Sequence, residues 1–107
     1  MINKPAVSRY KYTLNSNNLS EQLSTSGGIE IVAVLVTGGG SSAAVRIYDS
    51  ADGVNQPAPF ADSFLLAANA GESTPFTPAR PIKMDKGLYI ELEQGGPQGG
   101  EATIFYD

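Results

Sequence analysis

The alternation of apolar and polar residues along this chain predicts short β-strands. In segment 88–93, which reads LYIELE, every second side chain is apolar: Leu88, Ile90 and Leu92. A period of two is typical of a strand with one face in a core and one face in water. Similar or more continuously apolar runs predict further strands at 7–14, 29–37, 43–49, 63–68 and 102–107.

Turn signals separate these strands at intervals of about ten residues, as in all-β domains. The polar stretch 15–28 is expected to be mainly a loop with room for one helical turn, and 71–81 contains three prolines and should be extended or an edge. The glycines at 38–40 are expected to make a tight hairpin with positive φ. The chain of 107 residues therefore predicts one antiparallel β-sandwich or jelly-roll-like domain over 7–107, after a short N-terminal arm, 1–6.

Strand 29–37, IEIVAVLVT, is apolar on both faces. One sandwich core covers only one face of each sheet. Strict alternation puts Val32, Val34 and Val36 on one face, so we expect protein outside the sandwich to cover them, an identical subunit first of all. The alternative cover is the arm or the proline-rich loop around Phe60. The residues expected largely inside the core are Tyr10, Tyr12, Ile31, Leu35, Val45, Ile47, Leu88, Ile90, Leu92 and Ile104.

Charge is distributed unevenly. Lys4, Arg9 and Lys11 give the first twelve residues a charge of +3, and since the whole chain carries −4, the remainder carries −7. An acidic body is a poor partner for nucleic acid or anionic membranes. The interleaved run RYKYT favours a strand with its tyrosines inward over a nucleic-acid site. We expect the basic arm, including Lys4 and Pro5, to dock on an acidic groove or sheet edge of a partner.

The residue types argue against enzymatic chemistry. The chain has no Cys, His or Trp, so it lacks a disulfide framework, a thiolate nucleophile and the usual near-neutral base. The spacing of Asp49, Asp52 and Asn55 could suit Ca²⁺, but Asp and Gly are also ordinary turn residues. Glu91 and Glu93 stand about 7 Å apart on one strand face, where solvated carboxylates are the simpler interpretation. No enzyme, cofactor or metal site is expected.

Nothing in the sequence indicates secretion or membrane insertion. The first residues lack the apolar core of a signal peptide, and the longest apolar run, Ile31–Val36, is far shorter than the ~20 residues needed to span a bilayer. The lack of Cys suits a reducing cytoplasm.

Three segments carry a resemblance to a protein family. They are GGIEIVAVLVTGGGSSAAVRIYDSADG (27–53), GLYIELE (87–93) and EATIFYD (101–107). Together they resemble small β-sandwich structural proteins of tailed bacteriophages, most of all head decoration (cement) proteins. The resemblance covers about 27–107 and implies a non-enzymatic virion protein, made in the host cytoplasm. It further implies an oligomer, often a trimer, that clamps neighbouring subunits of the major capsid protein on the capsid surface.

Two other functions stay open at this point. One is a tail or neck component of the virion. The other is a carbohydrate-binding module, which would need exposed aromatic rings such as Tyr48, Tyr89 and Phe60. For the virion protein, the residues expected at partner interfaces are Lys4, Pro5, Arg9, Val32, Val34, Val36 and Phe60.

Overall fold

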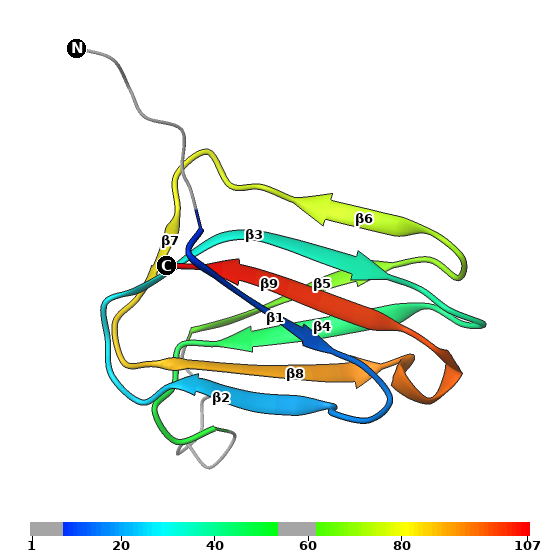
Figure 1. Cartoon of the computed structure of the whole chain (residues 1–107), viewed down its shortest axis with the longest axis horizontal. Coiled ribbons are helices and arrows are strands. Elements are labelled where there is room, and N and C mark those ends of the chain that lie inside the picture. Colours follow the sequence, from blue (N-terminus) through cyan, green and yellow to red (C-terminus); the bar gives the residue numbers. More distant parts are fainter. Residues whose placement is uncertain (1–7, 54–61) are drawn as a thin grey trace.

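The computed structural model describes residues 8–53 and 62–107. They form β-strands, one short 3₁₀ turn and no α-helix (Figure 1). The strands are β1 (Tyr10–Leu14), β2 (Ser20–Ser24), β3 (Ile29–Thr37), β4 (Ala43–Tyr48), β5 (Ser63–Ala68), β6 (Ser73–Phe76), β7 (Ile82–Met84), β8 (Leu88–Gln94) and β9 (Glu101–Tyr106), with the 3₁₀ turn η1 at Gly96–Gln98.

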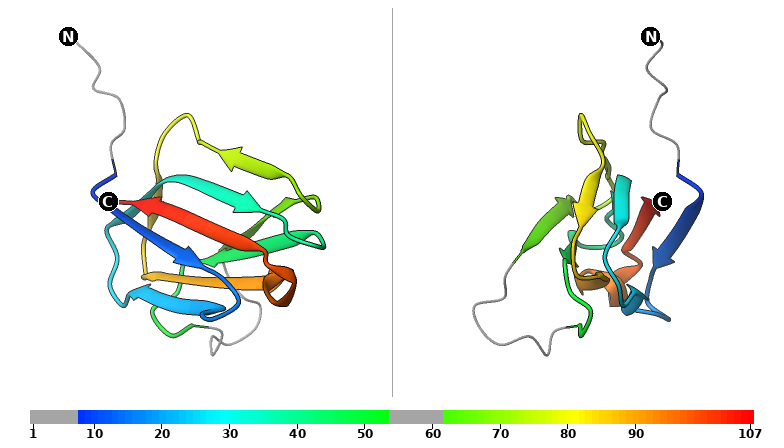
Figure 2. Two further views of the ribbon diagram at one scale, coloured as in Figure 1. Left: turned by 45° about the vertical axis from the view of Figure 1, so that its right-hand side comes forward. Right: turned by 90° about the vertical axis from the view of Figure 1, so that its left-hand side faces the viewer.

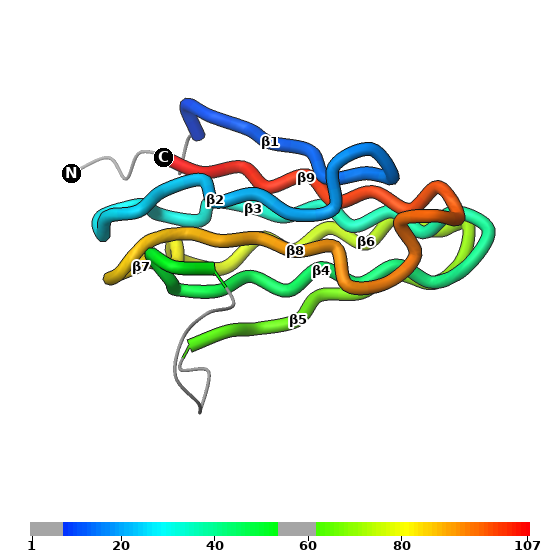
Figure 3. The backbone as a smooth tube through the Cα atoms, turned by 90° about the horizontal axis from the view of Figure 1, so that it is seen from below, coloured from blue at the N-terminus to red at the C-terminus, as the bar shows by residue number. Residues whose placement is uncertain are grey.

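Two antiparallel sheets pack face to face, so the predicted all-β sandwich is confirmed (Figures 1 and 3). The five-stranded sheet has the order β1-β9-β3-β6, and β7 pairs with the first part of β3 where β6 does not reach. The four-stranded sheet has the order β2-β8-β4-β5. The first and last of the described strands are neighbours, because β1 pairs with β9.

Seven of the fourteen residues in the buried core cluster are ones that the alternation predicts. Each of the following is less than 5% exposed, as predicted: Ile31, Val45, Ile47, Leu88, Ile90, Leu92 and Ile104. Tyr10 is 51% exposed, so its predicted burial was wrong; it lies at the outer end of β1, where its ring stacks on Tyr106. Tyr12 is only half-buried at the sandwich edge, where its hydroxyl donates to Glu21. Leu35 is half-buried on the outer face of its sheet.

A β-bulge explains why the alternation failed in β3. Ile31 pairs with Tyr106 and Ala33 with Phe105, so β3 advances two residues where β9 advances one. The extra residue, Val32, interrupts the period of two. Before the bulge the odd-numbered Ile31 points into the core, and after it the even-numbered positions do.

The polar stretch 15–28 contains a strand that the pattern did not predict. Ser20–Ser24 forms β2, at the edge of the four-stranded sheet. Its register against β8 shifts between Gln22 and Ser24, and every residue of β2 is half-buried. An edge strand with a bulge and polar side chains has no clear alternation, which is why a loop was the wrong prediction. The proline-broken stretch 71–81 does provide an edge strand, β6, as expected.

The glycines at 38–40 have a different role from the predicted one. They connect β3 and β4, which lie in different sheets, so they form no hairpin, and none of them has a positive φ. Gly39 is required by close packing instead: a Cβ atom there would stand 2.2 Å from the backbone oxygen of Gln98. The loop between β8 and β9, which contains Gln98, therefore approaches the 38–40 loop too closely for any side chain at position 39.

Candidate functional site

On the outer face of the five-stranded sheet, β3 and β9 bring a group of mainly apolar side chains together. Ala33 pairs with Phe105 and Leu35 with Thr103, so four neighbouring outer side chains form a compact group, here called the outer β3–β9 patch. All four are half-buried by their neighbours in the sheet. No described strand lies over this face, which fronts the molecule in Figure 1 and lies at its margin in the right-hand view of Figure 2.

The β3 valines do not form an exterior surface. Val34 and Val36 are each 1% exposed and belong to the core, so their predicted place at a subunit interface was wrong. The physical reason is the bulge at Val32, which turns both valines inward and leaves Ala33 and Leu35 on the outer face. Val32 itself is half-buried. After the bulge, the residues predicted for the two faces of β3 are exchanged, whereas Ile31, before the bulge, points into the core as predicted.

Of the other predicted interface residues, only Arg9 belongs to the described ranges. Lys4, Pro5 and Phe60 lie outside them. Arg9 is exposed, and its Nε pairs with the carboxylate of Asp107. An exposed ion pair of this kind contributes little to stability and leaves the guanidinium accessible.

The carboxylate of Asp49, in the loop after β4, accepts hydrogen bonds from a neighbouring turn. It is 7% exposed; Oδ1 accepts from the backbone N–H of Lys86 at 2.7 Å and of Gly87 at 3.2 Å, and Oδ2 accepts from Asp85 at 3.0 Å. Burial alone would raise the pKa of Asp49, but these backbone hydrogen bonds outweigh it and hold the pKa below its ordinary value. Asp49 thus fixes the turn between β7 and β8.

The neighbouring loop residues do not complete an ion site with Asp49. Asp52 is exposed, and its backbone N–H donates to the hydroxyl of Ser50, which in turn donates to the carbonyl of Gly53. Asn55 lies outside the described residues. Within 8–53 and 62–107, no cluster of three or more acidic, Cys or His side chains could hold a metal ion.

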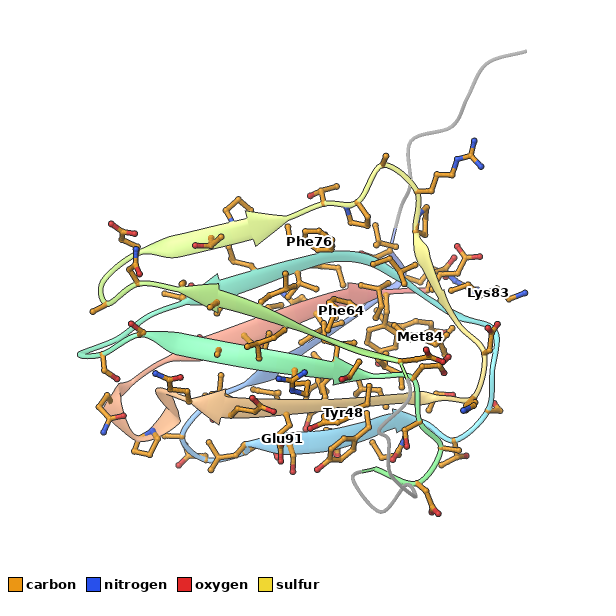
Figure 4. All side chains as sticks on the ribbon, turned by 180° about the vertical axis from the view of Figure 1, so that it is seen from behind. Tyr48, Phe64, Phe76, Lys83, Met84 and Glu91 are labelled. Atoms are coloured by element: carbon orange, nitrogen blue, oxygen red, sulfur yellow. The ribbon has the colours of Figure 1, made fainter. Side chains whose placement is uncertain are left out.

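The carboxylates of β8 belong to a cross-strand network on the outer face of the four-stranded sheet. Tyr48 donates its hydroxyl to Glu91 at 3.2 Å (Figure 4). The Nε of Arg46 donates to Glu93 at 2.7 Å. Burial, followed by the negative charges of Glu91 and Glu93, raises the pKa of Tyr48 to about 12. Tyr48 therefore stays a neutral donor at physiological pH. The network joins β4 to β8, and sequence reasoning, which expected the two glutamates in water, missed it.

Two hollows open on the described surface. One, of about 460 Å³, lies over β8 and is lined by Leu19, Ser20, Glu91, Leu92 and Glu93. The other, of about 300 Å³, lies where β4 ends and β5 begins, beside β7. Phe64 and Met84 are among its lining residues (Figure 4), as is Ile82. Asp49 also reaches this hollow, but its oxygens are occupied by the β7–β8 turn. Neither hollow presents a nucleophile hydrogen-bonded to a base.

Comparison with known proteins gives no relative: no family model, curated protein or solved structure matches this chain. In the part of the chain that the structure describes, no helix has the length and apolar character to cross a membrane.

Proposed function

We propose that this chain is a non-enzymatic structural protein of a tailed-phage virion, a capsid decoration protein that binds the major capsid protein. The resemblance of segments 27–53, 87–93 and 101–107 supports the phage origin. The observation that carries a binding role is the outer β3–β9 patch, an apolar sheet face with no second layer over it among the described residues. Contiguous apolar surface of this kind marks interaction sites.

The patch is suited to a flat protein surface. Leu35 and Phe105 supply apolar area, and Thr103 supplies a hydroxyl that already bonds to the hydroxyl of Thr13 at 2.9 Å. Lys11 lies beside Phe105 on β1, and Glu101 lies at the opposite end of β9. An apolar centre with charges at its borders has the composition of a protein–protein interface. The basic arm would add further contacts to the partner through its positive charge.

A tail or neck protein is the second virion role, and it would use the same surface. A carbohydrate-binding module receives less support from the aromatic side chains. Tyr48 is 7% exposed and Tyr89 is half-buried against it, so these two rings do not present an open platform. Tyr10 is the one exposed aromatic side chain in the described ranges. Binding of the purified protein to a glycan array would favour the carbohydrate role instead.

Co-sedimentation with capsids tests the proposal. The purified chain is mixed with undecorated capsids of the phage that encodes it, and bound protein is measured after pelleting. Leu35→Asp places a charge at the centre of the patch and should reduce occupancy strongly. Leu19→Asp makes the same change at an exposed leucine outside the patch, and should bind like the original chain.

Circular dichroism of both variants must first show a folded sandwich. Two results would contradict the proposal: no binding of the original chain to capsids, or equal binding of Leu35→Asp and the original. Binding to isolated tails but not to heads would move the role to the tail.

A further inference from the structure

Among the described strands, β5 is the one edge strand that has no feature to discourage another strand from pairing with it. β5 pairs with β4 along Ser63–Ala68 in an unbroken register, and no described strand pairs with its other side. The right-hand view of Figure 2 shows β5, in light green, at the margin of the molecule. An open edge presents a row of unpaired backbone N–H and C=O groups, which is a template for another strand.

The hydrogen-bond alternation identifies those groups. The N–H of Asp49 donates to the carbonyl of Asp62 at 2.9 Å, just before the β4–β5 register begins. Hydrogen-bonded pairs alternate along an antiparallel ladder, so the next residues bonded to β4 are those at 64, 66 and 68. The N–H and C=O groups of Ser63, Leu65 and Ala67 therefore point away from β4.

Every other edge has a feature that discourages pairing. The β1 edge carries the charged Lys11, and β2 contains a bulge and Glu21. β6 contains Pro75, and β7 is only three residues long and carries Lys83. β5, with the sequence SFLLAA, has no charge, proline or bulge.

We propose that the β5 edges of two copies of this chain pair antiparallel about a two-fold axis at Leu65. The three residues with outward backbone groups are symmetric about Leu65, so Ser63 of one copy meets Ala67 of the other and Leu65 meets its equivalent. This single register satisfies all the outward N–H and C=O groups of both strands. It joins the two four-stranded sheets into one continuous sheet.

The side chains favour a second copy as the occupant. Leu65 is 46% exposed on the outer face, and the two-fold axis would place the two leucines directly against each other. Phe64 and Leu66, both half-buried on the inner side, would extend each core toward the other. Because β5 carries no charge, the symmetric pairing creates no like-charge repulsion within the ladder. This inference does not rest on the capsid role.

Two variants separate the backbone pairing from general surface effects. Leu65→Lys places two ammonium groups across the two-fold axis. Ala67→Pro removes an outward N–H and leaves the β4 ladder intact, because that N–H does not bond to β4. Leu19→Lys is the matched control, since Leu19 is 43% exposed and lies outside β5.

Sedimentation velocity over a range of concentrations gives the first measurement. The original chain and Leu19→Lys should reach twice the monomer mass of 11.2 kDa at high concentration, whereas both β5 variants should stay at 11.2 kDa. A trimer mass that the β5 variants leave unchanged would overturn the proposal, as would a monomer at millimolar concentration. Circular dichroism establishes that each variant is folded.

Amide hydrogen exchange gives a residue-level measurement. At a concentration where about nine tenths of the chains are paired, only the remaining tenth expose the amides of Ser63, Leu65 and Ala67 to water. Exchange at these three amides should therefore be about tenfold slower than in the dilute monomer. Phe64 and Leu66, bonded to β4, should be protected at every concentration. Concentration-independent exchange at the three outward amides would contradict the pairing. Their protection only after capsids are added would assign the edge to a strand of another protein.

Discussion

Replacing Asp49 by Asn should destabilise the fold. The change removes the negative charge and one of the two acceptor oxygens that bind the backbone N–H groups of the β7–β8 turn. The carboxylate accepts backbone hydrogen bonds from Asp85, Lys86 and Gly87. Asparagine keeps the shape, and its single oxygen can still accept from Lys86 and Gly87, but its NH₂ group then faces the N–H of Asp85. Two donors facing each other without an acceptor and two weakened charge-assisted bonds together amount to about 2–4 kcal/mol in the free energy of unfolding.

The assay is urea denaturation of Asp49→Asn and of the original chain, followed by fluorescence or circular dichroism. Its pH dependence supplies an independent check. The folded-state pKa of Asp49 is lowered, so the unfolded chain takes up a proton first as the pH falls. The stabilisation is therefore fully present above the unfolded pKa of about 3.9, and it is lost as the pH drops from there through the folded value.

Asp52→Asn is the matched control. Asp52 lies three residues further along, is exposed and forms no side-chain hydrogen bond in the described structure, so this change should stay within about 0.5 kcal/mol. The reasoning would be refuted if both variants had the same stability at pH 7. It would also be refuted if the difference between Asp49→Asn and the original chain persisted unchanged well below the unfolded pKa.

The remaining predictions concern the core, a loop contact and the arm. Val34→Asp should cost several kcal/mol and unfold the domain, because it buries an unpaired charge, whereas Leu35→Asp should remain folded; thermal melts compare the two. Gly39→Ala should destabilise by about 1–3 kcal/mol through its clash with a backbone carbonyl, while Gly40→Ala, whose Cβ atom meets nothing closer than 3.7 Å, should be nearly neutral in urea denaturation. Deleting 1–6 should leave the melting temperature unchanged but weaken capsid attachment, and unchanged occupancy on capsids would count against a docking role for the arm.

The sequence by itself was sufficient for the class of fold and about half of the buried core. Alternation in 88–93 correctly predicted that Leu88, Ile90 and Leu92 lie inside. Successive side chains of a strand point to opposite faces, so a strand with one buried face has an apolar residue at every second position. Glycine and proline marked most of the strand ends. The lack of His and Cys restricts the chemistry that this chain can perform in any fold.

Tertiary structure decided which face of each strand became surface and which residues met across the fold. The bulge at Val32 arises from pairing with β9, about seventy residues later in the chain, so no local pattern could show that Val34 would turn inward and Leu35 outward. Asp49 has the residue type of a cation ligand, but the β7–β8 turn, 36 to 38 residues away, supplies its hydrogen-bond donors. The open edge of β5 follows from strand order alone. Local sequence determines how a strand alternates, but long-range pairing determines where alternation breaks and which edges stay free.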